Sequence, residues 1–136
     1  MNREFKDAIE NSPIIAAIKN DAELHQCLTC DSQVIFILYG DLCNIADIVD
    51  TVKSAGKIAL VHLDLIGGLN AKEIAVDFIK KYTRADGIIS TRPNLIHHAK
   101  ELGLITVQRF FLLDSISFEN VVRQSSHADV IDILPG

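Results

Sequence analysis

The sequence has 136 residues, of which 49% are hydrophobic and 23% are charged, and its formal net charge is −5. This length and balance predict a single domain over residues 1–136, and they exclude a fibrous, low-complexity or disordered chain. The acidic balance gives no bulk signal for nucleic acid or an anionic membrane, although it does not exclude a local basic patch.

The start of the sequence carries no export signal. The first ten residues alternate in charge and contain no apolar run, which argues against a signal peptide. The longest strongly apolar run, at residues 34–39, is too short to span a bilayer. Three cysteines, an odd number, are typical of a reducing compartment. We therefore predict a soluble, cytoplasmic protein without a membrane partner.

Short apolar runs alternate with helical stretches along the chain. The runs at 34–39 and 58–63 are almost continuously apolar, a pattern typical of parallel strands covered on both faces. The predicted strands are residues 14–17, 34–39, 58–63, 87–90, 105–110 and 130–134.

Two of the intervening stretches begin with a capping signal. Asn20 with Glu23, and Asn70 with Glu73, have the spacing of a capping box at a helix start. A third stretch carries apolar residues at i, i+3, i+4 and i+7, which predict one buried helical stripe. That stripe consists of Ile45, Ile48, Val49 and Val52.

Helix ends are marked as well. Gly56 and Gly103 follow predicted helices at the position where a left-handed residue is favourable. Pro93 suits the first turn of the helix that follows the fourth strand. The pattern is six βα steps without the last helix, so the fold class is α/β with a parallel sheet. Two architectures fit: an open doubly wound sheet and part of a (β/α)₈ barrel.

Polar residues gather at the carboxyl ends of the predicted strands, where both architectures bind ligands. The opposite ends, such as Lys57 and Ile105, show no comparable polar cluster. The candidate ligand-binding residues are His62, Asp64, Ser90, Thr91, Arg92, Gln108, Arg109 and Asp132.

His62 and Asp64 are two residues apart, so on one strand they face the same side. Their donors and acceptors suit a polyol ligand or acid–base chemistry. The alternative is that both residues only hold the turn at Gly67 and Gly68 through hydrogen bonds to backbone.

Ser90, Thr91 and Arg92 lead directly into a predicted helix start. Free backbone N–H groups, a hydroxyl and a guanidinium there could cradle a phosphate or carboxylate. The alternative is plain N-capping by Thr91 with a solvated Arg92. Arg109 and Asp132 lie on successive strands, and a structural ion pair between them is as plausible as a ligand contact.

Other chemistry-bearing residues give weak signals. Cys27 and Cys30 form a single CxxC without the second pair that zinc needs, and Cys43 is interpreted as helix packing. His97 and His98 are adjacent on a helix and point in different directions. No GxGxxG or Walker pattern occurs. We predict no cofactor, no metal ligand and no catalytic residue.

Four blocks together resemble the glycerol uptake operon antiterminator regulatory proteins: HLDLIGGL (62–69), DGIISTRPNLI (86–96), QRFFLLDS (108–115) and DILPG (132–136). The resemblance covers almost the whole chain, with the blocks in the family's order and spacing. It implies a TIM-barrel-like protein that senses glycerol 3-phosphate and binds leader RNA of glycerol-utilisation genes, so that transcription passes a terminator.

The resemblance also assigns the candidate residues to one site. His62 and Asp64 match the family's HxDL block, the ISTR block supplies residues 90–92, the QRxF block supplies residues 108–109, and Asp132 precedes LPG. By implication these residues line the mouth where glycerol 3-phosphate binds. The family normally continues beyond LPG with further βα units, including a Gly-rich phosphate segment. The expectation is a barrel incomplete at about six strands, with its C-terminal units absent. The chain is then either a piece of the whole barrel or is completed at its open edge by another chain, for example in a homo-oligomer.

Two other function classes stay open at this point. One is a phosphosugar-handling barrel enzyme that uses His62 and Asp64 as acid and base. The other is a phosphorylated receiver domain with Asp64 as acceptor, although no acidic pair follows the first strand and no lysine ends the fifth.

Overall fold

The computed structural model describes residues 3–11, 14–112 and 128–135. Its centre is one parallel sheet of six strands in the order β1-β2-β3-β4-β5-β6. The strands are β1 (Ile15–Ile18), β2 (Val34–Ile37), β3 (Ile58–His62), β4 (Gly87–Ser90), β5 (Ile105–Leu112) and β6 (Val130–Pro135). All six predicted strands are confirmed, with small differences at their ends.

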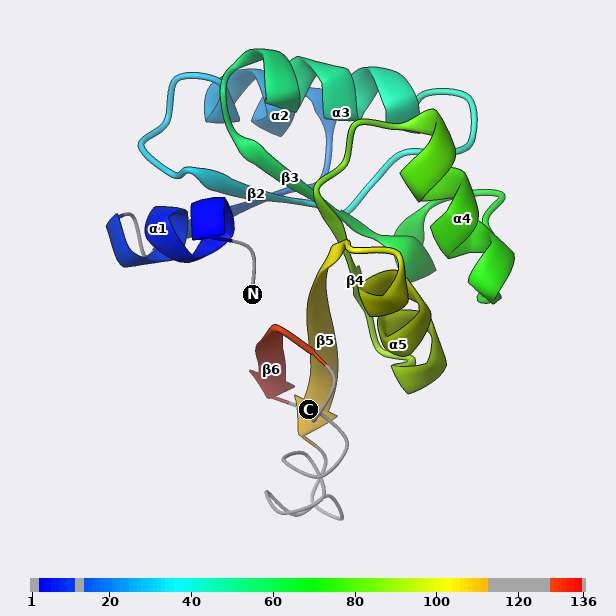
Figure 1. The fold of residues 1–136 in the computed structure, drawn as a ribbon. Coiled ribbons are helices and arrows are strands. Elements are labelled where there is room, and N and C mark those ends of the chain that lie inside the picture. The colour runs from blue at the N-terminus through cyan, green and yellow to red at the C-terminus, as the bar shows by residue number, and fades with distance from the viewer. Residues whose placement is uncertain (1–2, 12–13, 113–127, 136) are drawn as a thin grey trace.

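The helices are α1 (Arg3–Asn11), α2 (Asp21–Cys27), α3 (Ile45–Ser54), α4 (Glu73–Tyr82) and α5 (Pro93–Glu101), with a short 3₁₀ turn η1 (Leu63–Leu65). Helices α2 to α5 lie on the outer side of the curved sheet, and α1 lies on the inner side (Figure 1). The predicted crossover between β5 and β6 falls outside the described residues.

This arrangement decides between the two architectures. A doubly wound sheet reverses its strand order and carries helices on both faces, and a receiver domain shares that topology. Here every strand pairs with its successor and the crossover helices share one face, as in a (β/α) barrel. The fold is therefore TIM-barrel-like, and β1 and β6 are the edge strands of the sheet.

Two apolar clusters form on the two faces of the sheet. The outer cluster packs alternate strand residues such as Ile35, Val61 and Ile88 against helices α2 to α5. The inner cluster contains Val34, Phe36, Ile58, Leu60, Ile89, Ile105 and Val107, together with Phe5 of α1. This period of two allows each strand-end residue to be assigned to a face.

Helix α1 was not among the predicted elements, although Phe5, Ala8 and Ile9 have helical i, i+3, i+4 spacing. Phe5 is fully buried, and Ala8 and Ile9 pack against the same inner cluster. The helix therefore covers the inner face near the amino ends of the strands, where burial of about one large side chain contributes ~2 kcal/mol.

One predicted helix cap is confirmed and the other is wrong. The Asn20 side chain accepts from the backbone N–H of Glu23 at 2.8 Å, and the Glu23 carboxylate accepts from Lys19 N–H at 2.9 Å. At α4 the N-cap is Lys72, which makes no side-chain cap contact with a described residue. Asn70 instead closes a tight turn, since its carbonyl accepts from Lys72 N–H at 2.8 Å.

The remaining helix signals are confirmed. All four residues of the α3 stripe are buried, and Pro93 is the first residue of α5. Gly56 and Gly103 have φ values of +78° and +80° just after α3 and α5. That left-handed conformation is costly for a residue with a Cβ, which explains glycine at both helix ends.

The amino ends of the strands hold more polar chemistry than the sequence predicted. Lys57 is only 5% exposed, and its Nζ donates to the carbonyls of Cys30 at 2.8 Å and Ser32 at 2.7 Å. The Asp86 carboxylate accepts from Lys53 Nζ at 2.8 Å and from the backbone of β3 at 2.9 Å. These contacts hold loops against the starts of the strands, so we interpret their role as structural.

Candidate ligand-binding site

Asp64 joins two loops at the carboxyl edge of the sheet. One carboxylate oxygen accepts from Ser90 Oγ at 3.2 Å, and the other accepts from Thr91 N–H and Thr91 Oγ1, both at 3.0 Å. Strand β3 ends at His62, so Asp64 lies in η1 and does not share the strand with His62 as predicted. The carboxylate thereby holds η1 against the β4–α5 loop.

The β4–α5 loop is organised by the same contacts. Ser90 is fully buried, and its Oγ also accepts from Arg92 N–H at 3.1 Å. The alternative that Thr91 caps α5 is wrong, because its hydroxyl is directed to Asp64 and the N-cap of α5 is Arg92. The expected free backbone N–H groups are not found at Thr91 and Arg92, since these donate to Asp64 and Ser90. Arg92 is exposed at the start of the helix.

The η1 turn is fixed on its other side as well, by the loop that carries Gly40 and Asp41 after the end of β2. Gly67 forms a parallel bridge with Asp41, in which Gly67 N–H donates to the Gly40 carbonyl at 2.9 Å. The Asp41 carboxylate in turn accepts from Cys43 N–H at 2.8 Å and Asn44 N–H at 3.1 Å. Three successive loops thus form one hydrogen-bonded rim.

His62 and Arg109 lie on the inner face beneath and beside this rim. His62 follows Ile58 and Leu60, and Arg109 follows Ile105 and Val107, at intervals of two along their strands. His62 is 3% exposed, whereas Arg109 is partly exposed. The backbone register pairs Arg109 with Asp132, so the predicted adjacency of these two positions is confirmed.

Ser90 and Gln108 belong to the opposite, helix-covered face, and the register places them side by side. They therefore do not lie on the same face of the sheet as His62 and Arg109. A single binding site lined by all four residues would require that. Gln108 is 1% exposed, and neither polar atom of its amide has a partner among the described residues. The alternation of residues along each strand could have predicted these two faces, because Ile89 and Val107, which precede Ser90 and Gln108, are apolar residues of the inner face.

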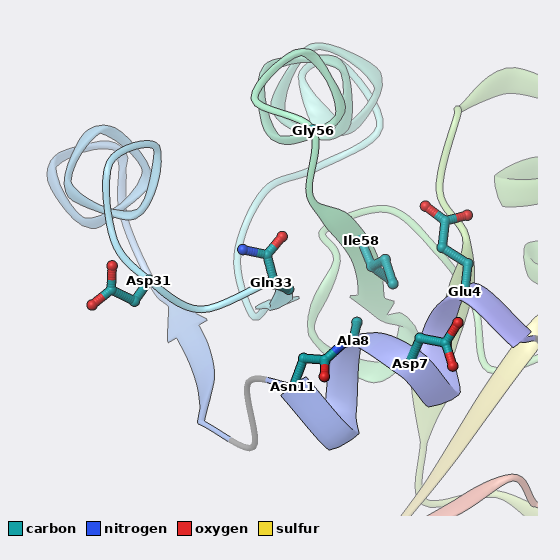
Figure 2. Close-up of a pocket in the computed structure, with 8 residues that line it drawn as sticks. All are labelled: Glu4, Asp7, Ala8, Asn11, Asp31, Gln33, Gly56 and Ile58. Carbon is teal, nitrogen blue, oxygen red and sulfur yellow. The ribbon is translucent and has the colours of Figure 1, made fainter.

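A different pocket lies at the amino ends of the strands (Figure 2). It has a volume of about 480 Å³ and is bounded by α1, by the loop before β2 and by the start of β3. Glu4, Asp7 and Asp31 line it, and no lysine or arginine is among its lining residues. Three carboxylates without a lining cation would repel an anionic ligand, so phosphate chemistry is favoured at the carboxyl edge.

The three cysteines are free, and Cys43 is exposed in the turn before α3, so its predicted role in helix packing is wrong. Cys27 is buried, and burial is the largest cause that raises the pKa of its thiol, followed by the nearby Cys30. Among residues 3–11, 14–112 and 128–135 no cluster of three or more His, Cys, Asp or Glu side chains could hold a metal ion. In the same residues, none of the helices is long and apolar enough to cross a membrane.

The sequence and the fold both resemble known proteins. The family model of the glycerol-3-phosphate responsive antiterminators matches residues 14–136. The Escherichia coli (strain K12) protein named uncharacterized protein YgcP is 42% identical over 130 residues, which are 94% of this chain and 68% of that protein.

Two crystal structures share the fold over 90% of this chain. The glycerol uptake operon antiterminator regulatory protein of Listeria monocytogenes str. 4b F2365 has a TM-score of 0.82 and 32% identity, with 67% of its length covered. A glycerol uptake operon antiterminator-related protein of Thermotoga maritima MSB8 has a TM-score of 0.78 and 35% identity, with 70% covered.

A more distant likeness concerns the fold alone. The nitroalkane oxidase of Streptomyces ansochromogenes superposes with a TM-score of 0.56 at 14% identity, over 85% of this chain and 36% of the oxidase. At that identity a shared barrel-type fold says nothing about a shared reaction.

Proposed function

Because this chain belongs to the glycerol-3-phosphate responsive antiterminator family, we propose that it is a regulator that binds glycerol 3-phosphate and, in response, leader RNA of glycerol-utilisation genes. The family match over residues 14–136 is the observation that carries the proposal. The hydrogen-bonded rim at the carboxyl edge supports it, since a ligand sensor needs a preorganised site.

The proposed ligand contacts come from the polar residues around this rim. His62 lies on the inner face, where the donor and acceptor capacity of an imidazole suits the hydroxyl groups of glycerol. Arg92 and Arg109 offer guanidinium groups, which bind phosphate through two parallel hydrogen bonds. Asp132 is the register partner of Arg109 on β6 and is the last of the proposed ligand-binding positions. Asp64, Ser90 and Thr91 position the two loops that carry these groups.

Ser90 and Gln108 have a less direct place in this proposal. Both lie on the face of the sheet that the helices cover. We propose that they act on the ligand through the β4–α5 loop and the end of β5. The hydroxyl of Ser90 links Asp64 to Arg92, which supports such an indirect role.

The contacts of Asp64 favour the regulator over a barrel enzyme. Its two oxygens already accept three hydrogen bonds, at 3.0 to 3.2 Å. A carboxylate used as a general base must instead reach the proton of a substrate. A positioning role therefore fits the geometry better than an acid–base pair with His62.

Thermal unfolding with added ligand tests the first half of the proposal. Glycerol 3-phosphate at 100 times its Kd should stabilise the folded protein by about 2.7 kcal/mol, whereas glycerol or inorganic phosphate alone should have far smaller effects. Arg109→Gln should weaken the response, and Arg3→Gln, an exposed change on α1, should not. An equal response to glycerol, phosphate and glycerol 3-phosphate would contradict a specific sensor.

RNA binding tests the second half. The affinity for a leader RNA upstream of a glycerol-utilisation gene should rise when glycerol 3-phosphate is added, because binding at two coupled sites is reciprocal. An affinity that stays constant across a full ligand titration would refute the ligand-responsive part.

A further inference from the structure

The outer face of α4 exposes a row of apolar and aromatic side chains. Ile74 is 66% exposed and Tyr82 is 60% exposed, and Phe78 lies between them one helical turn from each. The core-facing side of the same helix is already occupied by Ala75, Val76 and Ile79. Phe78 is partly buried and also packs against the outer cluster, whereas Ile74 and Tyr82 are exposed beyond what the fold needs.

The row borders a small pocket of about 240 Å³. It is lined by Ile74, Asp77, Phe78, Lys81 and Tyr82. The rings of Phe78 and Tyr82 pack at a centroid distance of 5.3 Å, which supports Tyr82 from one side. Lys81 Nζ lies 5.4 Å from the centre of the Tyr82 ring. A flat ring and an ammonium group are thus presented together at the surface.

Positive charge concentrates at this end of α4. Lys80 and Lys81 are the one pair of adjacent cationic residues in the sequence, and Arg84 follows three residues later. Arg84 pairs with Asp50 at 3.5 Å, but both side chains are more than half exposed, so the pair is weak.

One carboxylate of the pocket is engaged elsewhere. Asp77 contacts His98 Nε2 of α5 at 2.9 Å. The Asp77 carboxylate is therefore held by a side chain of α5.

We propose that this surface, defined by Phe78, Lys81 and Tyr82, binds single-stranded RNA together with Lys80, which lies on another side of α4, and Arg84, which follows the helix. A base stacks on the exposed Tyr82 ring while the cations contact neighbouring phosphates, the combination by which proteins hold single strands. A chain with a net charge of −5 needs such a local cluster to attract RNA at all. The inference rests on the proposed function and assigns its RNA-contacting surface.

A second copy of the chain fits this face less well. A two-fold contact centred on the row would place each copy's patch against the same patch of its partner. The two Lys80–Lys81 pairs would then approach each other, and like charges at an interface oppose association.

Fluorescence anisotropy with the full chain tests the surface, using a labelled leader RNA and a labelled single-stranded RNA of mixed sequence. Tyr82→Ala should weaken binding about tenfold or more, because one base loses its stacking partner. Tyr82→Phe keeps the ring and should bind like the wild type.

The lysines are tested by salt dependence. Lys80→Gln with Lys81→Gln should reduce the slope of log K against log salt by about 1.4, since each phosphate contact on a single strand contributes about 0.7. Arg3→Gln with Lys6→Gln removes the same charge from exposed positions of α1 and should leave the slope unchanged.

The outcomes separate this inference from the function on which it rests. If the Tyr82→Ala and double-lysine variants both bind leader RNA like the wild type, with an unchanged salt slope, the proposed surface is wrong. The antiterminator proposal would then still stand. Wild-type protein that binds neither RNA overturns both. A dimer that Tyr82→Ala dissociates without loss of RNA affinity would assign the face to a second copy instead.

Discussion

Removal of the Asp64 carboxylate should destabilise the protein, because Asp64 is the common acceptor of the rim. Asp64→Ala deletes the hydrogen bonds from Ser90 Oγ, Thr91 N–H and Thr91 Oγ1. A hydrogen bond to a charged group contributes about 1.5–3 kcal/mol when it is protected from water. Asp64 is itself exposed and Thr91 is partly exposed, so water weakens their bonds and can replace them, whereas Ser90 is fully buried and its hydroxyl loses a partner. We therefore expect the free energy of unfolding to fall by about 1–2 kcal/mol.

Urea denaturation measures this loss as a shift of the midpoint at an unchanged m value. The exposed carboxylate Asp7 of α1 offers a matched control, and Asp7→Ala should lie within about 0.5 kcal/mol of the wild type. A double-mutant cycle of Asp64→Ala with Thr91→Val should show a coupling of about 1 kcal/mol. If Asp64→Ala is as stable as Asp7→Ala, or the coupling is zero, the rim is not held as the distances indicate.

Three further predictions concern other parts of the fold. Gly87→Ala should lower the free energy of unfolding by about 3 kcal/mol or more, because a Cβ at position 87 would collide with the Ile105 carbonyl oxygen and lie 2.6 Å from the Ile105 Cβ. The urea midpoint measures this loss. Lys57→Met should cost about 2–4 kcal/mol, because two backbone carbonyls lose their donor, and calorimetry should show a lower Tm. Burial, and next to it the hydrogen bond to Asp21, raises the pKa of Tyr39. The stability that this contributes is complete below the usual tyrosine pKa of about 10 and is lost as pH rises through the raised pKa. Tyr39→Phe should therefore flatten the decline of the urea midpoint at alkaline pH.

The secondary structure was predictable because its signals are local. The near-continuous apolar runs of β2 and β3, the i, i+3, i+4, i+7 stripe of α3 and the capping pair Asn20–Glu23 each act within a few residues. The wrong cap at Asn70 shows the limit of such signals. A turn between Asn70 and Lys72 competes for the same backbone groups, and spacing alone does not reveal which arrangement wins.

The candidate site was predictable in position and less so in detail. Strand ends carry the predicted polar residues because parallel strands all direct their carboxyl ends to one edge. Roles within that edge depend on contacts between loops far apart in the sequence. Asp64 meets Thr91 across 27 positions, and the bridge from Asp41 to Gly67 closes the other side of η1. No pattern within one segment specifies such a pairing.

The sequence by itself determined the alternation of strands and helices, the edge at which the polar residues gather, and the family, since each depends on residue order along short segments. The tertiary structure alone decided that the sheet is sequentially paired, that α1 covers its inner face, and that Ser90 and Gln108 turn away from His62 and Arg109. It also showed Lys57 buried among carbonyls and Tyr82 exposed beside Lys81. The physical reason is that burial and side-chain partners are set by the register and curvature of the sheet, which bring distant segments together only after folding.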